Sequence, residues 1–337
     1  MGQTLQVAAD RAHDHSKTVL PVEVARGIYI ENPPSAQALK LMHLLVAKAA
    51  GRMADEVQHE MRMSDLKHIE GMRNHDRASL RMLFTQLRAA VMVYDDTEAQ
   101  EEIVGGFMDE IRLDYRHEVT DALVVKWWFG RTFRRIAAES NHWTILDRQT
   151  VFALSSKYSI LLFQHVASLV NLDHVASKTF TVPELRALLG VETDKLGRFA
   201  DLNRRALQPA IAEINQLSRL TLTATPRKIG RTVASIEIAW AVKDDPFEAK
   251  RELTVSKVGR KVRRDGTAET VAPEFPETGG IAYSPRWRDL KRVAGCNMDD
   301  GLIANNFRRF LGERGIARNA ANVEKLFSDF CAKVGKV

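Results

Sequence analysis

A single stretch, residues 196–217, constrains the fold of this chain more than any other. Apolar residues recur there at steps of three and four, the spacing of a helix with one buried face: Phe199, Leu202, Ala206, Ala210, Ile214 and Leu217. The opposite face is polar and basic near its start, where it carries Arg198, Asn203, Arg204, Arg205 and Gln208. Such side chains can pair with phosphates or hydrogen-bond the edges of bases, so the pattern predicts a DNA-recognition helix. Pro209 removes one backbone hydrogen bond and predicts a kink near Arg205.

The residues before this helix predict a second, shorter helix. Thr181 and Glu184 have the spacing of a capping box, and Pro183 lies inside the first turn. Gly190 is suited to end a helix over residues 184–189. A short helix, a tight turn and a longer basic helix together form a helix-turn-helix.

The residues after the long helix predict a hairpin. Residues 220–224 and 232–242 alternate between apolar and other residues, which is the period of a strand. The second strand places on one face Ala234, Ile236, Ile238, Trp240 and Val242. The predicted turn over residues 226–231 contains three cations and is followed by a threonine: Arg227, Lys228, Arg231 and Thr232. Cations at a hairpin tip suit contact with a phosphate backbone, so the sequence predicts a winged helix whose wing binds DNA.

The first half of the chain repeats this order in a more divergent form. A helix that follows residues 74–76 has one apolar side, formed by Leu80, Leu83, Phe84 and Leu87. Its other side carries candidate DNA contacts, Arg77, Ser79, Arg81 and Arg88. Residues 91–94 and the region around 111–115 predict two strands of a hairpin. We therefore expect an α+β fold with two tandem winged-helix domains, of which the first contacts DNA more weakly.

The predicted wing of this first domain is acidic. Its carboxylates would repel phosphates: Asp95, Asp96, Glu98, Glu101, Glu102, Asp109 and Glu110. Two interpretations stay open. The hairpin serves protein contacts such as dimerisation, or it is a solvated loop.

The charge distribution agrees with DNA binding by the second domain. The 337 residues have a net charge of +6, yet residues 1–150 carry −3 and residues 151–243 carry +5. A basic region that coincides with a predicted recognition helix and wing is expected of a nucleic-acid-binding surface. No apolar run reaches the length of a membrane span and the first twenty residues lack a secretory core, so we expect a cytoplasmic protein that binds no membrane. Cys296 and Cys331 are then expected to be reduced.

The chain divides into five expected segments. Residues 1–20 lack periodicity and predict a flexible arm. Residues 21–140 and 141–243 are the two winged-helix domains, and residues 244–280 read as a basic linker. Residues 281–337 predict a small C-terminal helical module. Trp127, Trp128 and Phe129 lie near the domain junction, where we expect them to fill an interdomain core rather than to stack on a single strand.

Four ordered motifs resemble the initiator replication proteins of iteron-containing plasmids. They begin with residues 152–163, Phe152-x-Leu154-Ser155-Ser156-Lys157-Tyr158-Ser159-Ile160-Leu161-Leu162-Phe163. The next is Glu184-Leu185-Arg186-x-Leu188-Leu189-Gly190-Val191. The last two are Leu207-x-Pro209-Ala210-Ile211-x-Glu213-Ile214-Asn215 and Lys228-x-Gly230-Arg231. Four motifs in order at sensible spacing are more specific than any short pattern. One residue departs from the family: Leu196 stands where an aromatic residue is usual.

The resemblance implies two winged-helix domains that bind repeated origin sequences, called iterons. It further implies a monomer on the iterons in equilibrium with a homodimer on an inverted repeat, where the protein represses its own gene. Melting of an AT-rich segment and recruitment of the host initiator and the replicative helicase are implied as well.

No catalytic or cofactor motif is apparent, so we expect no enzyme activity, no metal site and no cofactor. His13-Asp14-His15 has a charged middle residue and is a poor match to the metal site of nicking initiators. His117 and Glu118 lack the second histidine of a zinc protease, and there is no Walker A loop. Two alternatives remain: a winged-helix transcriptional regulator without an origin role, and a nicking enzyme with a catalytic tyrosine such as Tyr283.

Overall fold

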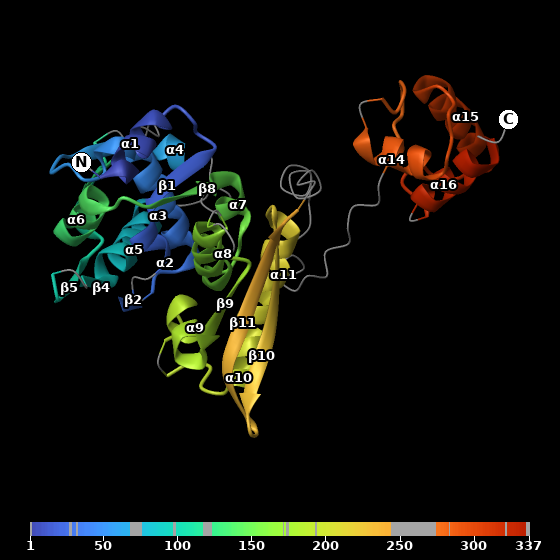
Figure 1. The fold of residues 1–337 in the computed structure, drawn as a ribbon. Helices are drawn as coiled ribbons and strands as arrows, with labels where there is room; N and C mark the ends of the chain where they lie inside the picture. Colours follow the sequence, from blue (N-terminus) through green and yellow to red (C-terminus); the bar gives the residue numbers. More distant parts are fainter. Residues whose placement is uncertain are drawn as a thin grey trace. The chain divides into compact units, whose positions relative to one another are not determined.

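The computed structural model describes residues 2–26, 29–31, 33–67, 76–96, 99–116, 123–170, 172, 175–192, 194–243, 274–282, 284–320 and 322–334. The chain forms two compact units, Met1–Ala268 and Glu269–Val337 (Figure 1). The first unit mixes helices with short antiparallel sheets, and the second is helical. Among the described residues, no helix has the length and apolar content needed to span a bilayer.

The expected flexible arm over residues 1–20 is wrong. Helix α1 (Gln3–Asp10) buries Leu5 and Ala8, and strand β1 (Lys17–Pro21) pairs with β8 (Trp143–Asp147). The Thr4 hydroxyl lies 3.0 Å from the hydroxyl of Ser140, to which it donates. The segment is ordered by partners about 130 residues away in the sequence, which a search for local periodicity does not detect.

The first domain begins with helices that alternate with short strands. Its first elements are α2 (Val22–Arg26), β2 (Tyr29–Glu31), α3 (Ala36–Ala49), η1 (Ala50–Arg52), β3 (His59–Arg62) and α4 (Met63–Lys67). Helix α5 (Arg77–Ala89) follows, and Asp76 caps it by accepting from the backbone N–H of Ser79 at 2.9 Å. The apolar side predicted for α5 is buried as expected.

The strands of this part pair differently from the prediction. Strand β4 (Val91–Asp96) pairs with β5 (Glu101–Gly106), whereas β6 (Met108–Asp114) pairs with β7 (Val124–Phe129). The expected hairpin between residues 91–94 and 111–115 is therefore wrong. The chain changes sheet between Gly106, the last residue of β5, and Met108, the first of β6. Close packing requires glycine at residue 105, where a Cβ would lie 1.8 Å from Thr132 Oγ1.

The acidic residues consequently fall in two sheets. Asp95 lies opposite Glu102 and Asp96 opposite Glu101 in the β4–β5 pair, whereas Asp109 and Glu110 belong to β6. Glu98 lies outside the described residues. A role for this surface in dimerisation stays a proposal.

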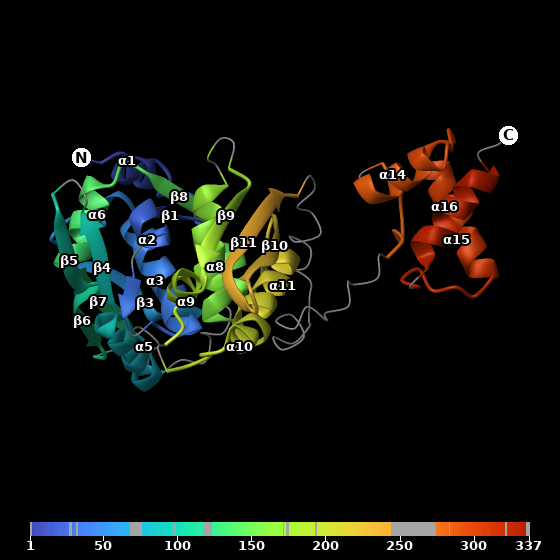
Figure 2. The ribbon, with the colours of Figure 1, turned by 60° about the horizontal axis from the view of Figure 1, so that its bottom comes forward.

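Helix α8 (Lys157–Leu169) occupies the middle of the unit and is buried along most of its length. It follows α6 (Arg131–Glu139), β8 and α7 (Arg148–Ala153). Helices α2 and α3 contact one side of α8, and α9 and α11 contact another, as Figures 1 and 2 show. One continuous apolar core therefore extends across both halves of the unit.

The second half of the unit is a winged helix, as expected. Its elements are β9 (Ser177–Thr181), α9 (Val182–Leu188), α10 (Phe199–Leu202), the π-helical turn η3 (Asn203–Leu207), α11 (Gln208–Leu217), β10 (Leu220–Ile229) and β11 (Thr232–Val242). The sheet has the order β10-β11-β9 and packs its buried residues Leu222, Ile236, Ile238 and Trp240 into the core. Val242, predicted on the same face, is exposed instead.

The C-terminal unit is a helical module, formed by α14 (Pro285–Val293), α15 (Asp300–Glu313) and α16 (Val323–Val334). Phe275 is fully buried in its core, with ring centroids 4.9 Å from Trp287 and 4.8 Å from Phe307. Residues 274–280 were expected in the linker, and for them that prediction is wrong because Phe275 packs into the module. Residues 244–273 of the predicted linker lie outside the described residues.

Candidate nucleic-acid interface

The helix-turn-helix begins with the predicted capping box. The Thr181 hydroxyl accepts from the backbone N–H of Glu184 at 3.3 Å, and the Glu184 carboxylate accepts from the backbone N–H of Thr181 at 2.7 Å. The backbone N–H and the hydroxyl of Thr181, which both donate to the carboxylate, lower the pKa of Glu184. Gly190 ends the helix at a φ of +59°, and a Cβ there would lie 2.9 Å from Leu161 and Pro33. The sequence motif around residue 190 thus reflects a backbone and space requirement for glycine.

Arg186 orders the turn between the two helices. Its guanidinium donates to the backbone oxygens of Leu196 at 2.5 Å, of Lys195 at 2.6 Å and of Glu192 at 3.1 Å. Leu196 has a φ of +51°, a conformation that is strained for a residue with a side chain. The arginine therefore fixes the geometry with which the chain enters α10. Periodicity and motif spacing predict no such function for Arg186, although a cation in the last turn of α9 is a signal for binding carbonyl oxygens.

The predicted recognition helix is continuous from α10 through η3 to α11. Leu202, Ala206, Ala210, Ile214 and Leu217 are all buried as predicted, and Phe199 is half-buried. A π-helical turn stands where a kink was expected, and Pro209 occupies the first turn of α11. Because proline has no N–H, the carbonyl of Arg205 loses its usual helical partner, and the wider turn accommodates this loss.

The polar side chains predicted for DNA lie on the exposed side of this helix. Arg198 and Gln208 are exposed, and the side chains of Arg204 and Arg205 are 71% and 64% exposed. Gln208 donates to the Asn203 side-chain oxygen at 3.2 Å. Four of the five predicted residues are thus exposed along this helix, and the fifth, Asn203, is half-buried beside Gln208.

Asp201 lies beside Arg204 and Arg205, a contact that the sequence pattern does not predict. Its carboxylate lies 3.0 Å from Nη2 of Arg204 and 3.9 Å from Nε of Arg205. It holds both guanidiniums near the start of the helix. Because these ion pairs are exposed, they are weak enough to be replaced by contacts with phosphates or bases.

Two residues of the third family motif hold the helix in place. The side chain of Asn215 accepts from the backbone N–H of Leu222 at 2.6 Å and donates to the Leu222 carbonyl at 3.0 Å. Glu213 is fully buried and accepts from the backbone N–H of Ser155 at 2.7 Å. Asn215 therefore joins α11 to β10, and Glu213 joins α11 to the start of α8.

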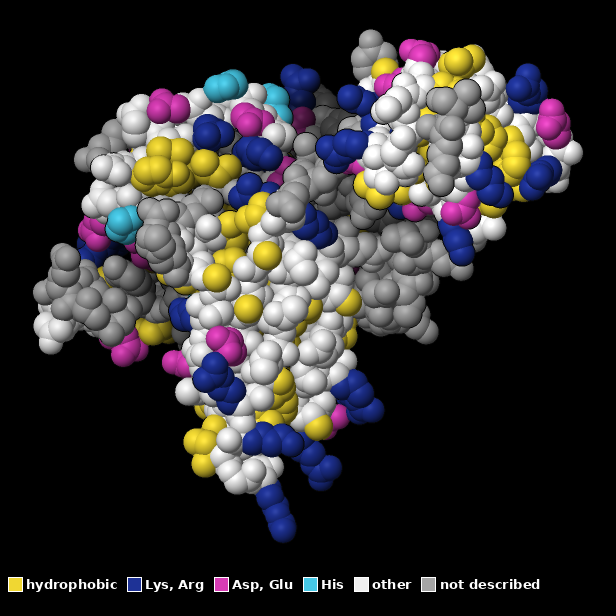
Figure 3. All heavy atoms as spheres, turned by 45° about the vertical axis from the view of Figure 1, so that its right-hand side comes forward, with side chains coloured by type: hydrophobic (Ala, Val, Ile, Leu, Met, Phe, Trp, Pro, Cys, Tyr) yellow, Lys and Arg dark blue, Asp and Glu magenta, His cyan; other side chains and the backbone are white. Residues whose placement is uncertain are grey.

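The wing differs from the predicted loop over residues 226–231. The ladder continues to the pair Ile229 and Thr232, so the turn is only Gly230 and Arg231, with Gly230 at a φ of +62°. Figure 3 shows Lys and Arg side chains gathered at the end of this projecting hairpin. The tip also carries Ile229, 78% exposed.

The wing cations have different partners. Arg227 donates to the Glu237 carboxylate at 2.6 Å and lowers the pKa of that carboxyl, with a smaller effect from Ser177. Lys228, Arg231 and Thr232 are exposed, and the described residues offer Lys228 and Arg231 no ion pair. Lys228 and Arg231 are therefore freer than Arg227 to bind phosphates.

The candidates of the first domain surround a groove of about 660 Å³ between α5 and β6. Arg77, Arg81 and Arg88 line it, and the Arg77 guanidinium lies 4.3 Å from the centre of the Tyr115 ring. Asp109 and Glu110 line the opposite side and reduce its positive charge. Ser79 is absent from this lining, and its hydroxyl donates to the Asp76 cap at 2.7 Å. The groove is thus a weaker candidate for phosphate binding than the second domain.

The aromatic run of β7 is mostly core. Trp127 and Phe129 are buried against His59, with ring centroids 5.5 Å and 5.2 Å away. Trp128 is half-buried beneath the Arg112 guanidinium, which lies 4.9 Å from its ring centre. Packing was correctly expected over stacking, but these partners belong to the first domain and not to an interdomain core.

Within the described ranges, no three His, Cys, Asp or Glu side chains are grouped to hold a metal ion. Tyr283, the tyrosine considered for nicking, lies outside those ranges, as do His117 and Glu118.

Comparisons with protein families identify the two halves of the first unit. A model described as "Initiator Replication protein, WH1" matches residues 28–167, and one described as "Initiator Rep protein, WH2" matches residues 181–240. Together the two models span more than half of the chain. The chain belongs to the initiator Rep protein family. This initiator therefore contains two winged-helix domains, as the sequence motifs implied, and neither model reaches its C-terminal module.

One solved structure is similar to the initiator in fold. A structure described as "Crystal structure of Pi initiator protein in complex with iteron DNA" matches with a TM-score of 0.50 and 19% identity, covering 68% of this chain and 98% of that chain. A second match, described as "Crystal structure of SeMet derivatives of domain2 and domain 3 of RctB", has a TM-score of 0.37 and 8% identity over 61% of this chain and 80% of that chain. A search of curated protein sequences gives no significant match.

Proposed function

We propose that this Rep-family initiator binds iterons at a plasmid origin and starts replication there. The observation that carries the proposal is the surface formed by α10, η3 and the wing. It presents Arg198, Asn203, Arg204, Arg205 and Gln208 beside a hairpin tip with Lys228 and Arg231. The solved relative whose fold it shares is described in complex with iteron DNA.

The helix and the wing are expected to bind different parts of the DNA because their side chains differ. A helix that enters the major groove can read bases through arginine and asparagine side chains, each good pair being worth about 1–3 kcal/mol of discrimination. A lysine on a hairpin tip contacts phosphates and carries no sequence information by itself. Arg198, Asn203, Arg204 and Arg205 are therefore proposed as base readers, and Lys228 and Arg231 as phosphate contacts. Arg227 joins them once its pair with Glu237 opens.

The remaining parts of the proposal concern assembly. We infer that the protein is a monomer on iterons and a homodimer on an inverted repeat at its own promoter, where it represses its gene. Opening of an AT-rich segment would then allow the host initiator and the replicative helicase to be recruited. The protein contributes binding and positioning to these steps, and no catalytic group is assigned. The proposed location is the cytoplasm, on plasmid DNA.

The direct test uses DNA that flanks the protein's own gene. Fragments with one, two or more repeats are titrated with the full-length protein beside scrambled fragments of equal length. The proposal expects complexes whose number rises with the number of repeats. A plasmid that carries the origin should also replicate only when the gene is present.

A matched control separates DNA reading from loss of charge. Arg219 is exposed and lies at the opposite end of β10 from the wing turn, about 30 Å away for ten strand residues. Arg219→Ala should bind like the wild type. Sequence-blind binding, or replication that does not need the gene, would contradict the proposed function.

A further inference from the structure

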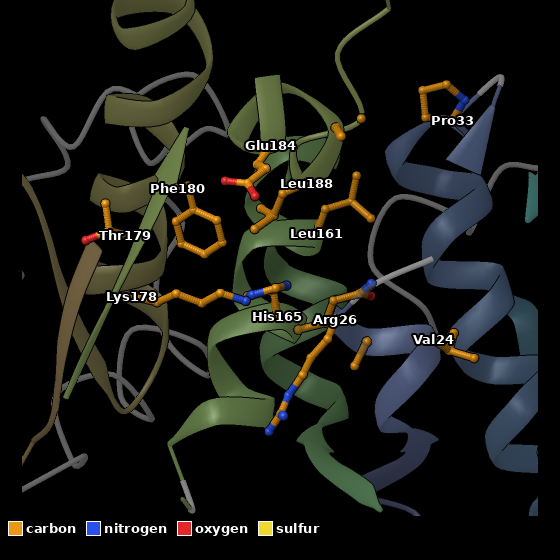
Figure 4. A pocket seen from close by; sticks show the side chains of 14 residues that line it. Val24, Arg26, Pro33, Leu161, His165, Lys178, Thr179, Phe180, Glu184 and Leu188 are labelled. Atoms are coloured by element: carbon orange, nitrogen blue, oxygen red, sulfur yellow. The ribbon is translucent and has the colours of Figure 1, made fainter. Parts of the chain in front are cut away.

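A hollow of about 360 Å³ lies on the seam between the first domain and the winged helix of the second (Figure 4). One wall comes from α2 and Pro33, and the other from β9 and α9. Helix α8 forms the floor with Leu161, Gln164 and His165. Its volume falls in the range of small-molecule sites, about 300–1,000 Å³.

Two cations line this hollow, each with a carboxylate in its wider surroundings, Glu23 for Arg26 and Glu184 for Lys178. Arg26 donates through Nε to the Ser168 hydroxyl at 2.9 Å and through Nη2 to the Ser168 carbonyl, both neutral groups. Lys178 reaches from β9 toward His165, as Figure 4 shows, and its Nζ lies 5.1 Å from the centre of the Phe180 ring. Neither cation forms an ion pair with a described carboxylate. The walls therefore favour an anion.

The single carboxylate in the lining is already engaged. Oε2 of Glu184 accepts from the backbone N–H of Thr181 at 2.7 Å and from the Thr181 hydroxyl at 2.9 Å. These bonds belong to the capping box of α9, and they hold the carboxylate at the start of that helix. Glu184 thus forms no close ion pair with Lys178, although the two charges still attract each other.

A polar atom at the floor also lacks a partner. His165 is 3% exposed, and its Nε2 has no hydrogen-bond partner among the described residues. Burial, with a smaller effect from Lys178, lowers the pKa of His165 to about 3, so the ring is neutral near pH 7. Buried polar atoms without partners are uncommon and call for an explanation such as a missing ligand.

We propose that this hollow binds a phosphate monoester of about mononucleotide size. The phosphate would lie between Arg26 and Lys178, because its charge of −1.5 to −2 matches two cations and its oxygens accept from both. The organic part would extend along Leu161 and Leu188 toward the unpaired Nε2 of His165. The volume is on the order of ten times that of one water molecule, so a bare phosphate would leave most of it empty.

The proposal is tested without DNA, so its failure is distinct from failure of the proposed function. Full-length protein is titrated by calorimetry with AMP, GMP, CMP, UMP and glucose 6-phosphate, and with adenosine and inorganic phosphate as partial ligands. At least one ester should bind with one-to-one stoichiometry and at least tenfold more tightly than either partial ligand. The imidazole ¹⁵N resonance of His165 should move during that titration.

Matched variants locate the binding site. Lys178→Met keeps the length of the side chain and removes its charge, and should weaken ester binding at least tenfold. Lys195→Met removes an exposed lysine that pairs with Glu192 away from the hollow, and should leave binding unchanged. Arg204→Ala should also leave it unchanged, which separates the hollow from the DNA surface.

Three outcomes would overturn the proposal. The first is that none of the five esters saturates the protein below about 10 mM, a concentration at which binding is too weak for a formed site. The second is that binding survives Lys178→Met. The third is that inorganic phosphate binds as tightly as the best ester, which would reduce the hollow to a bare anion site.

Discussion

Asn215→Ala should destabilise the second winged helix by about 2–4 kcal/mol. The Asn215 amide satisfies both backbone groups of Leu222 on the side of β10 that faces away from β11, at 2.6 Å and 3.0 Å. Leu222 is 1% exposed, so water replaces these bonds poorly. The two backbone groups are part-buried, so each costs about 1–2 kcal/mol when unsatisfied, the lower part of the range for buried groups. The higher helix propensity of alanine offsets roughly 0.5 kcal/mol of this loss.

Differential scanning calorimetry of the full-length protein measures the effect. For a unit of this size, 1 kcal/mol corresponds to about 2–4 °C, so the transition of the first unit should fall by roughly 5–15 °C. Asn215→Asp keeps the acceptor for the N–H of Leu222 and loses the donor, so its transition temperature should lie between those of the wild type and Asn215→Ala. Asn203→Ala removes only a surface bond to Gln208 and should change stability by less than about 0.5 kcal/mol. An unchanged transition in Asn215→Ala would refute the reasoning.

Three further predictions concern acid stability, the turn and the module. His43 and His165 are buried and neutral, with pKa values lowered by burial to about 4 and about 3. Below pH 6.5 the unfolded chain protonates these histidines and the folded chain does not, so the free energy of unfolding should fall as the pH drops toward 4. The loss is up to about 1.4 kcal/mol per pH unit for each histidine. Urea titrations at pH 7, 6 and 5 measure this free energy, and a flat profile would contradict the prediction. Arg186→Met should lower DNA affinity at least tenfold in gel-shift titrations, since α10 loses its fixed entry, and wild-type affinity would contradict that function. Phe275→Ala should destabilise the C-terminal module by about 3–5 kcal/mol and leave the main calorimetric transition in place, whereas a shift of both transitions would mean that the two units unfold together.

Local signals in the sequence predicted the second winged helix well. The capping box at Thr181 and Glu184 and the apolar spacing from Leu202 to Leu217 depend on residues a few positions apart. These local patterns predict the same elements regardless of the contacts that the rest of the chain makes. The same applies to Gly190, whose positive φ and close neighbours follow from ending a helix against α8.

Long-range pairing was the main source of error. Strand β1 finds its partner β8 about 130 residues later, and α1 is held at Ser140, so residues 1–20 looked unstructured when read alone. Strand β5 is acidic at its start and resembled a loop, which led to pairing β4 with the wrong strand. Phe275 stands in a region rich in proline and charge, and only its burial against Trp287 shows that it belongs to the module.

The candidate DNA site shows the same division. Periodicity placed Arg204 and Arg205 on the exposed face of the helix, and the turn between the two strands placed Arg227, Lys228 and Arg231 on the wing. It did not show that Asp201 holds both arginines, or that Arg227 is paired with Glu237. These pairs depend on geometry across turns and strands.

The central claim is that the helix reads bases while the wing holds phosphates. The most direct measurement is a salt series of binding to repeat-bearing and scrambled DNA by the wild type, Arg204→Ala, Lys228→Ala and the control Arg219→Ala. Arg204→Ala should lose about 1–3 kcal/mol on repeats and far less on scrambled DNA. Lys228→Ala should weaken binding to both DNAs equally and reduce the slope of log affinity against log salt concentration by about 0.9. Equal losses on both DNAs for Arg204→Ala would contradict base reading by this helix.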